Sequence, residues 1–161
     1  MALLEIKKAG DPVLKKVCEP VEKIDKRLRN LLDDMAETMY ASEGVGIAAP
    51  QVGKSIRVCV VDVDRENRKS RYDLINPVIT HREGSVVDNE GCLSCPDLFG
   101  DVERAEKIRV EYISRFNKKK TLEAEGLLAR CIQHEIDHLD GKLFIDIATN
   151  ITKGKRDNKQ G

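Results

Sequence analysis

The chain has 161 residues, 35% of them charged, and its 28 Lys and Arg residues balance its 28 Asp and Glu residues. This length fits one domain, and the zero formal net charge argues against a dedicated nucleic-acid binder or a polybasic membrane anchor. The sequence contains no secretory signal and no apolar run of the roughly 18–20 residues that a membrane helix needs. Its five cysteines are therefore expected to be free thiols in a reducing cytoplasm.

Helical signals come first along the chain. Asp11 and Pro12 predict a short helix, because Asp caps a helix well and Pro suits the first turn. A longer helix is predicted from about Asp25 to about Ala41, since one apolar stripe repeats there at helical spacing. The stripe consists of Leu28, Leu31, Leu32, Met35 and Met39. The opposite face is charged, so this helix should lie on the surface with one side packed down.

The middle of the chain is predicted to form strands, because short runs rich in β-branched residues alternate there with turn signals. The predicted strands are residues 56–63, 72–76, 78–81, 85–87 and 107–113. The predicted turns between them are residues 76–77, 82–84 and 116–118.

A second helix is predicted from about Glu125 to about Leu139, with Gly141 as its stop. It carries two apolar rows, which are Leu128, Ile132, Ile136 and Leu139, and Leu127, Cys131, His134 and His138. A helix that buries two rows is a central one. We therefore predict a single α+β domain of antiparallel strands packed around this helix. The domain is expected to span residues 1–149, and residues 150–161 a frayed polar tail.

The strongest chemical signal is the segment His134-Glu135-Ile136-Asp137-His138. Two histidines four residues apart lie on one helix face, roughly 6 Å apart along the axis. Both imidazoles can then reach one metal ion, and Glu135 can act on a water there as general base. The alternative is a chance pair of structural histidines, but the chain has only three histidines. The third, His81, is interpreted as a surface residue.

A catalytic metal site usually has three protein ligands and one open position. The protease pattern with a third histidine fails because Phe144 stands at that position, and no glutamate follows His138. The third ligand should lie upstream, and Cys92 is the best candidate, since Gly91 allows close backbone approach. The alternative is a redox or structural-zinc pair of Cys92 with Cys95. We expect Cys95 to be a packing residue.

A third segment, residues 44–51, is rich in small side chains that allow another chain to approach the backbone. Gln51, at its end, can donate an amide hydrogen bond. The segment lacks the Lys-Ser/Thr pair of a phosphate-binding loop, so that interpretation is poor.

Together, GVGIAAPQ at 44–51, EGCLS at 90–94 and QHEIDH at 133–138 resemble the three motifs of the peptide deformylase family in order and spacing. The resemblance extends over almost the whole chain. It implies a metallohydrolase of the bacterial cytoplasm that removes the formyl group from the initiator N-formylmethionine of nascent polypeptides and releases formate. Residues 1–149 would be its catalytic domain. The resemblance also implies one divalent metal ion, natively Fe(II), for which zinc, nickel or cobalt can substitute.

The resemblance further assigns a role to individual positions. The metal ligands would be Cys92, His134 and His138. Glu135 would be the general base and acid, and the Gln51 amide and the backbone N–H of Leu93 would stabilise the oxyanion.

Other positions would bind or support the substrate. Val45, Gly46 and Gly91 would pair with the peptide backbone as an added strand does. The methionine pocket would involve Val45, Leu127, Cys131 and His134, which agrees with the helical row derived above. Glu90 would pair with Arg104 and brace the cysteine loop.

The expected partners are N-formylmethionyl nascent peptides, and the chain is expected to be a monomer that binds neither DNA nor membrane. Many family members carry a long charged C-terminal helix that can contact the ribosome. Here the tail has only four basic residues, Lys153, Lys155, Arg156 and Lys159. A solvated tail is favoured, with transient ribosome contact as the alternative.

Three other functions compete with the deformylase interpretation. They are a zinc endopeptidase, a non-catalytic metal-binding protein and a thiol redox protein using Cys92 and Cys95. One further residue is left open: Arg130, beside the pocket row, either guides the peptide or reaches solvent.

Overall fold

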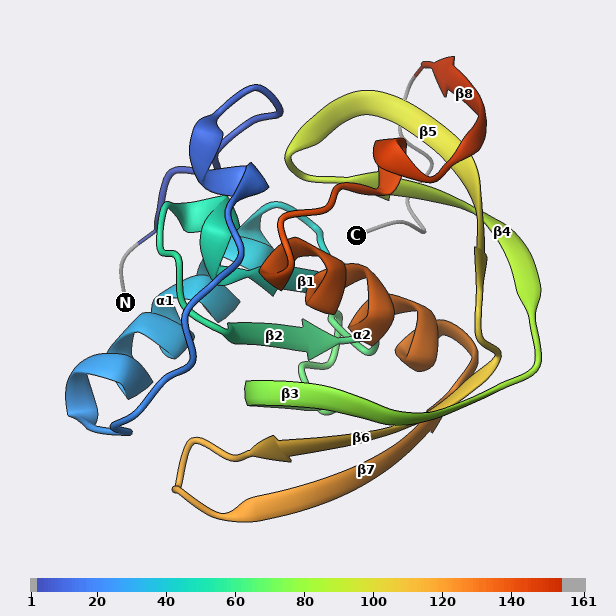
Figure 1. The fold of residues 1–161 in the computed structure, drawn as a ribbon. Helices are drawn as coiled ribbons and strands as arrows, with labels where there is room; N and C mark the ends of the chain where they lie inside the picture. Colours follow the sequence, from blue (N-terminus) through green and yellow to red (C-terminus); the bar gives the residue numbers. More distant parts are fainter. Residues whose placement is uncertain (1–2, 155–161) are drawn as a thin grey trace.

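The computed structural model describes residues 3–154, which form two antiparallel sheets and two α-helices. One sheet has the order β1-β2-β3-β6-β7 and the other the order β4-β5-β8. The strands are β1 Gly46–Ala48, β2 Val58–Asp62, β3 Arg71–Glu83, β4 Val86–Cys92, β5 Cys95–Arg104, β6 Lys107–Ile113, β7 Lys119–Glu125 and β8 Thr149–Lys153. The helices are α1 Lys26–Ala41 and α2 Gly126–Leu139. In Figure 1, α2 runs through the middle of the molecule between the two sheets, so the predicted α+β architecture around a central helix is confirmed.

Strand β2 is buried on both faces, which explains its continuous apolar run. Successive side chains of a strand point to opposite faces. Accordingly, Cys59 and Val61 belong to the core cluster that contains the apolar side of α2, whereas Val58 and Val60 belong to the cluster that contains α1. The two helices therefore cover opposite faces of the same strand.

Helix α1 forms as predicted. Asp25 caps it, and its carboxylate accepts a hydrogen bond from the Leu28 amide at 3.0 Å. Four members of the predicted stripe, Leu28, Leu32, Met35 and Met39, are buried, and Leu31 packs against the same cluster. On the opposite face, Lys26 and Arg27 are exposed, whereas Asp33 is half-buried by ion pairs. Ahead of α1, Pro12–Lys15 form the predicted short helix, of 3-10 type, with the Asp11 side chain as its cap.

Helix α2 is buried over most of its length, as the two apolar rows predicted. Leu127 is the exception, because 46% of its surface is exposed in the first turn. The helix ends at Leu139, and Gly141 follows with a φ of +76° in the left-handed region that glycine tolerates. The predicted stop is confirmed.

The predicted turn at Asn76-Pro77 is wrong, because β3 runs unbroken from Arg71 to Glu83. The pair forms a bulge instead, where the register against β6 shifts between Ile75 and Val78. Asn76 has a φ of +51°, which Asn tolerates better than most residues, and its side chain exchanges two hydrogen bonds with the Val21 backbone. A turn signal can thus mark a bulge inside a strand.

Strands β1, β5, β7 and β8 were not predicted. Strand β7 is mostly charged and exposed, with only Leu122 and Ala124 turned to the core, and β8 is exposed throughout, so the hydrophobic signal of both strands is weak. The frayed tail expected from about Asn150 is wrong for residues 150–153, because β8 pairs with β5. The remaining predicted tail, residues 155–161, lies outside the described residues.

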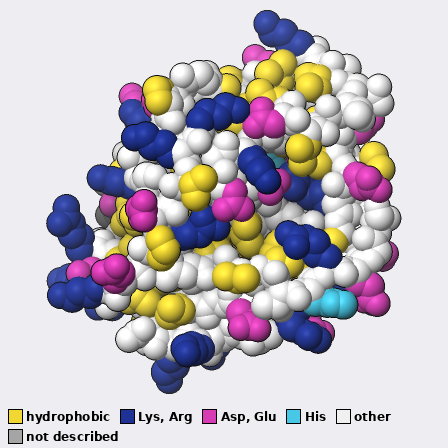
Figure 2. All heavy atoms as spheres, viewed as in Figure 1, with side chains coloured by type: hydrophobic (Ala, Val, Ile, Leu, Met, Phe, Trp, Pro, Cys, Tyr) yellow, Lys and Arg dark blue, Asp and Glu magenta, His cyan; other side chains and the backbone are white. Residues whose placement is uncertain are grey.

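The visible surface is mixed in charge. Figure 2 shows Lys and Arg side chains interspersed with Asp and Glu, and with small apolar patches, over the face viewed as in Figure 1. His81 is exposed in β3, as expected. None of the helices within residues 3–154 has the length and apolar character needed to cross a membrane.

Candidate metal centre

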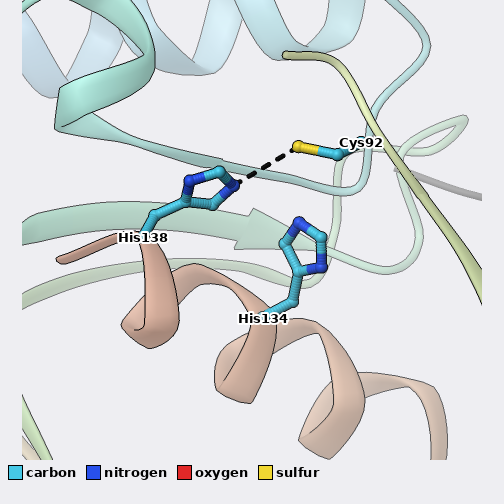
Figure 3. Close-up of side chains that lie close together, drawn as sticks. All are labelled: Cys92, His134 and His138. Carbon is cyan, nitrogen blue, oxygen red and sulfur yellow. Dashed lines mark hydrogen bonds between the residues drawn. The ribbon is translucent and has the colours of Figure 1, made fainter. Parts of the chain in front are cut away.

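Cys92, His134 and His138 come together in the buried interior. Cys92 ends β4, and the two histidines lie one turn apart on α2 (Figure 3). One ligand atom from each lies within 4.8 Å of the others. The Cys92 Sγ is 3.3 Å from His138 Nε2, and the imidazole centroids are 5.1 Å apart. Within residues 3–154 this is the one cluster of at least three His, Cys, Asp or Glu residues spaced to hold a metal ion.

The β4–β5 hairpin presents Cys92 to α2. Cys92 and Cys95 are opposite each other in the ladder, and β5 carries extra residues between this pair and the pair Glu90–Gly100. A Cβ on Gly91 would lie 2.9 Å from the Phe99 ring, so the hairpin needs glycine there to close. Cys95 is buried in a core cluster, as expected of a packing residue. All five cysteines are free thiols.

Glu90 joins this hairpin to the first histidine. Its carboxylate lies 2.9 Å from His134 Nδ1 and accepts two hydrogen bonds from Arg104, at 2.6 and 3.0 Å. Burial alone would raise the pKa of Glu90, but hydrogen bonds from His134 and Arg104 outweigh it and hold that pKa well below its usual range. An ionised carboxylate only accepts, so Nδ1 carries the proton and the His134 Nε2 lone pair is left for a ligand.

Glu135 is buried within the same site. Its Oε1 has no hydrogen-bond partner, and burial raises its pKa to about 7. An ideal Cβ on Gly46 of β1 would lie 2.4 Å from Glu135 Oε2, so the strand passes directly against this carboxylate. A carboxyl group that titrates near neutral pH is suited to taking up and returning a proton.

His138 is also incompletely partnered, because its buried Nδ1 has no hydrogen bond. Burial lowers the pKa of His138 well below its usual value, and the nearby His134 adds to the effect. A neutral imidazole is the form that binds metals. Of the three buried side-chain atoms without a partner in the described part of the chain, two belong to Glu135 and His138.

Gln51 lies beside Cys92. It sits in a 3-10 helix, Ala49–Val52, that directly follows β1. Its Oε1 accepts from the Ala48 amide at 2.9 Å, and its Nε2 is 3.2 Å from Ser94 Oγ and 3.7 Å from Cys92 Sγ. The side-chain amide is thus held with its N–H groups toward the hairpin tip, which contains Leu93.

A pocket adjoins the cluster. Its lining residues are Val45, Glu90, Gly91, Leu127, Arg130, Cys131, His134 and Glu135. Every residue expected around the methionine side chain is in this set. Gly46 is not, although it contacts Glu135 from β1.

Sequence reasoning missed the position of Arg130. The alternative that it reaches solvent is wrong, because only 8% of its surface is exposed and its guanidinium donates to Glu90 and to the backbone of Val86 and Val102. The available signal was its place four residues before His134, on the same helix face. Phe144 was noted only as a missing ligand. Its ring stacks on His134 with centroids 6.1 Å apart.

The donor set fits a metal ion. Two imidazoles and one thiolate supply three ligands of a tetrahedral site and leave the fourth position open. Hydrogen bonding to Cys95 and burial raise the pKa of the Cys92 thiol well above its usual value, so a cation is needed to hold this sulfur as thiolate. Glu135 and Gln51, both buried, border the cluster.

Comparisons with known proteins show which family this chain resembles. Residues 3–154 match the family model described as polypeptide deformylase. A peptide deformylase of Symbiobacterium thermophilum is 52% identical over 160 residues, covering 99% of this chain and 73% of the relative. The crystal structure of a peptide deformylase from Legionella pneumophila superposes with a TM-score of 0.89 and 44% identity, covering 92% of this chain and 88% of that one. A peptide deformylase from Synechococcus elongatus, solved in complex with actinonin, gives 0.89 and 43%, covering 91% and 81%.

Proposed function

The chain belongs to the peptide deformylase family and is a metallohydrolase that removes the formyl group from N-formylmethionyl peptides; we propose that Cys92, His134 and His138 hold its metal ion and that Glu135 moves the proton. One observation carries the proposal. The three ligand atoms lie within 4.8 Å of one another, beside a buried carboxylate whose Oε1 has no other partner.

Substrate binding is proposed along β1 and the end of β4. Val45, Gly46 and Gly91 would pair with the peptide backbone as an added strand does. The methionine side chain would enter the pocket lined by Val45, Leu127 and Cys131. The absence of a side chain at Gly46 supports this path, because a Cβ there would collide with Glu135.

When bound, the metal ion supplies a Lewis acid that polarises the formyl carbonyl and lowers the pKa of water. Glu135 accepts a proton from the water that attacks the formyl carbon. It then donates that proton to the departing amine, which gives formate and a free methionine N-terminus. Burial, which raises the pKa of Glu135 to about 7, suits it to both transfers near neutral pH.

The negative oxygen formed during attack needs donors held in place beforehand. We assign this role to the Gln51 side-chain amide and the backbone N–H of Leu93. Gln51 is buried and anchored through Oε1 by the Ala48 amide, which supports a fixed orientation. Glu90 and Arg104 are assigned the support of the cysteine hairpin, on the basis of their paired hydrogen bonds.

The metal is proposed to be Fe(II), with zinc, nickel or cobalt as substitutes. Two nitrogens and one sulfur suit zinc as well as iron, so the donor set alone does not choose between them. Elemental analysis of protein purified without oxygen tests this proposal. Iron at one atom per chain is expected, and zinc alone would contradict it.

The remaining proposals concern the oligomeric state, cellular location and partners of the enzyme. We propose a monomer of the bacterial cytoplasm that acts on nascent N-formylmethionyl peptides, binds neither DNA nor membrane, and touches the ribosome at most transiently. The catalytic domain is proposed as residues 1–149, although β8 continues the fold to Lys153.

Formate release from an N-formylmethionyl tripeptide tests the proposed chemistry, with iron-loaded protein prepared without oxygen. Rapid release is expected from the wild type. Glu135→Gln should keep its metal and lose about 10²–10⁴-fold in turnover, since proton transfer by a positioned group contributes that much. Glu123→Gln, at an exposed position on β7, serves as the control and should match the wild type.

The alternatives give different results in the same assay. A zinc endopeptidase would cleave inside unformylated peptides. A thiol redox protein using Cys92 and Cys95 would keep its activity in Glu135→Gln. Metal-loaded wild type that releases no formate would refute the proposed function. Binding of actinonin, seen in the Synechococcus elongatus relative, gives a check that does not depend on turnover.

A further inference from the structure

Arg130 occupies an unusual position for a charged residue. It lies on α2 four residues before His134, and it is almost fully buried. Its Nη1 is 2.5 Å from Glu90 Oε2 and 2.9 Å from the Val102 carbonyl oxygen, and its Nη2 is 2.7 Å from the Val86 carbonyl oxygen. Every one of these acceptors belongs to β4 or β5.

The metal ligands come from two parts of the fold that share no strand pairing. Cys92 belongs to the sheet β4-β5-β8, while His134 and His138 lie on the helix that packs against the other sheet. The separation of the sulfur from the imidazoles therefore depends on side chains that bridge the two parts. Arg130 bridges them from the helix to the strand backbone. Arg104 bridges them in the other direction, from β5 to Asp137 of α2 at 2.8 Å.

Glu90 connects this bridge to the ligands. The same carboxylate accepts from Arg130 and lies against His134 Nδ1, and Glu90 is two residues before Cys92 on β4. A shift of Arg130 would therefore move Glu90, which contacts His134. It would also move β4, the strand that carries Cys92. Guanidinium suits this task because its donors form a rigid planar fork, whereas Lys offers one compact charge on a flexible stem.

We propose that Arg130 is a positioning residue for the metal centre: it fastens the strand that carries Cys92 to the helix that carries His134 and His138 and so sets the spacing of the ligands. The inference rests on the proposed function, because it takes these three residues as the ligands. Side chains that orient metal ligands typically contribute 10–100-fold to metal affinity.

The test uses full-length protein loaded with Co(II), whose thiolate-to-metal absorption band reports the bond to Cys92. The rate of metal loss to excess chelator is measured beside it. Arg130→Met should weaken or shift the band and release metal about 10–100-fold faster than the wild type. Arg130→Lys should fall between the two, since it keeps the charge near Glu90 but not the full fork.

Arg57→Met is the matched control. Arg57 also contacts the end of α2, through the Leu139 carbonyl oxygen and the Asp140 carboxylate, both at 3.0 Å, but none of these residues is a ligand. The melting temperature of Arg57→Met is expected to fall, while its absorption band and its rate of metal loss stay at the wild-type values. Melting temperatures of all variants separate general destabilisation from an effect on the site.

Several outcomes would overturn the inference. One is wild-type metal loss and a wild-type band in Arg130→Met with only a lower melting temperature, as in the control. If Arg130→Met does not fold, Arg130→Lys decides by the same two readouts. Failure of both to fold would make Arg130 a folding determinant and reject the positioning role. Wild-type protein without a thiolate band would instead refute the proposed ligands.

Discussion

Gly46 is the glycine with the least room for a side chain beside the candidate site. An ideal Cβ on Gly46 would lie 2.4 Å from Glu135 Oε2 and 2.7 Å from Cys131 Sγ. Gly46 is the first residue of the buried strand β1 and pairs with Val61 of β2, so the backbone has little freedom to withdraw. The side chains of Glu135 and Cys131 thus lie so close to Gly46 that one added methyl group does not fit.

We expect Gly46→Ala to reduce kcat/KM for an N-formylmethionyl peptide by at least about 100-fold, because displacement of a reacting group by about 1 Å can cost that much. The metal content should stay at one ion per chain, since no ligand is touched. Steady-state kinetics and metal analysis together measure this. Gly154→Ala, where an added Cβ has no neighbour within 4 Å, should match the wild type. Wild-type kinetics in Gly46→Ala would show that Glu135 tolerates displacement.

At the scale of an element, α2 is bounded by two glycines in the left-handed region. Gly126 begins the helix with a φ of +62°, and Gly141 follows its end with a φ of +76°. Their surroundings differ. A Cβ at Gly126 would have no neighbour within 4 Å, whereas a Cβ at Gly141 would lie 2.5 Å from the backbone oxygen of Lys15.

This difference predicts unequal losses of stability. Gly126→Ala should lower the free energy of unfolding by about 1 kcal/mol, the cost of a left-handed backbone for an L residue. Gly141→Ala should cost about 2–4 kcal/mol, because the collision with backbone adds to the same strain. Urea unfolding of both variants beside the wild type measures the two losses. Equal losses would mean that the segment around Lys15 moves aside at little cost.

At the scale of the molecule, a charged network ties α1 to the five-stranded sheet. Asp33 of α1 accepts from Arg71 of β3 at 2.9 Å and from Arg115, after β6, at 2.5 and 3.1 Å. Both arginines also bond Asp73 of β3. Hydrogen bonding to Arg115 holds the pKa of Asp33 below its usual value.

A carboxyl group whose pKa is lowered on folding stabilises the fold above its unfolded pKa and loses that contribution as the pH falls through its folded pKa. Asp33→Asn should therefore cost about 1 kcal/mol at pH 7, and the difference from the wild type should shrink as the pH falls below about 4. Urea unfolding between pH 3 and pH 7 measures it. The exposed Asp88→Asn is the control for loss of one charge, and a pH-independent cost for Asp33→Asn would contradict the ionic explanation.

The sequence alone predicted the features that depend on local periodicity and spacing. The stripe of α1 and the rows of α2 follow from 3.6-residue repetition, since burial selects apolar residues on one face of a helix. The pair His134 and His138, with Glu135 between them, needs only the geometry of a helix. Cys92 was reached by elimination, and the structure brings it to the histidines.

Other features have no local signal. Strands β7 and β8 are held by backbone pairing with neighbours, and pairing leaves no pattern in exposed polar side chains. The bulge at Asn76-Pro77 reads locally as a turn, and only the partner strand β6 and the bonds to Val21 keep the chain extended.

Arg130 shows the same division within the site. Local spacing put it beside the pocket row and left open whether it reaches peptide or solvent. Its acceptors, Glu90, Val86 and Val102, are 28 to 44 residues away along the chain, so only the packing of two sheets around α2 could bring them to it. The sequence by itself determined the two helices and the placement of His134 and His138 on one helix face, because these follow from local spacing. The tertiary structure decided the remaining strands and the bridge between the ligand-bearing parts, because those depend on contacts between distant segments.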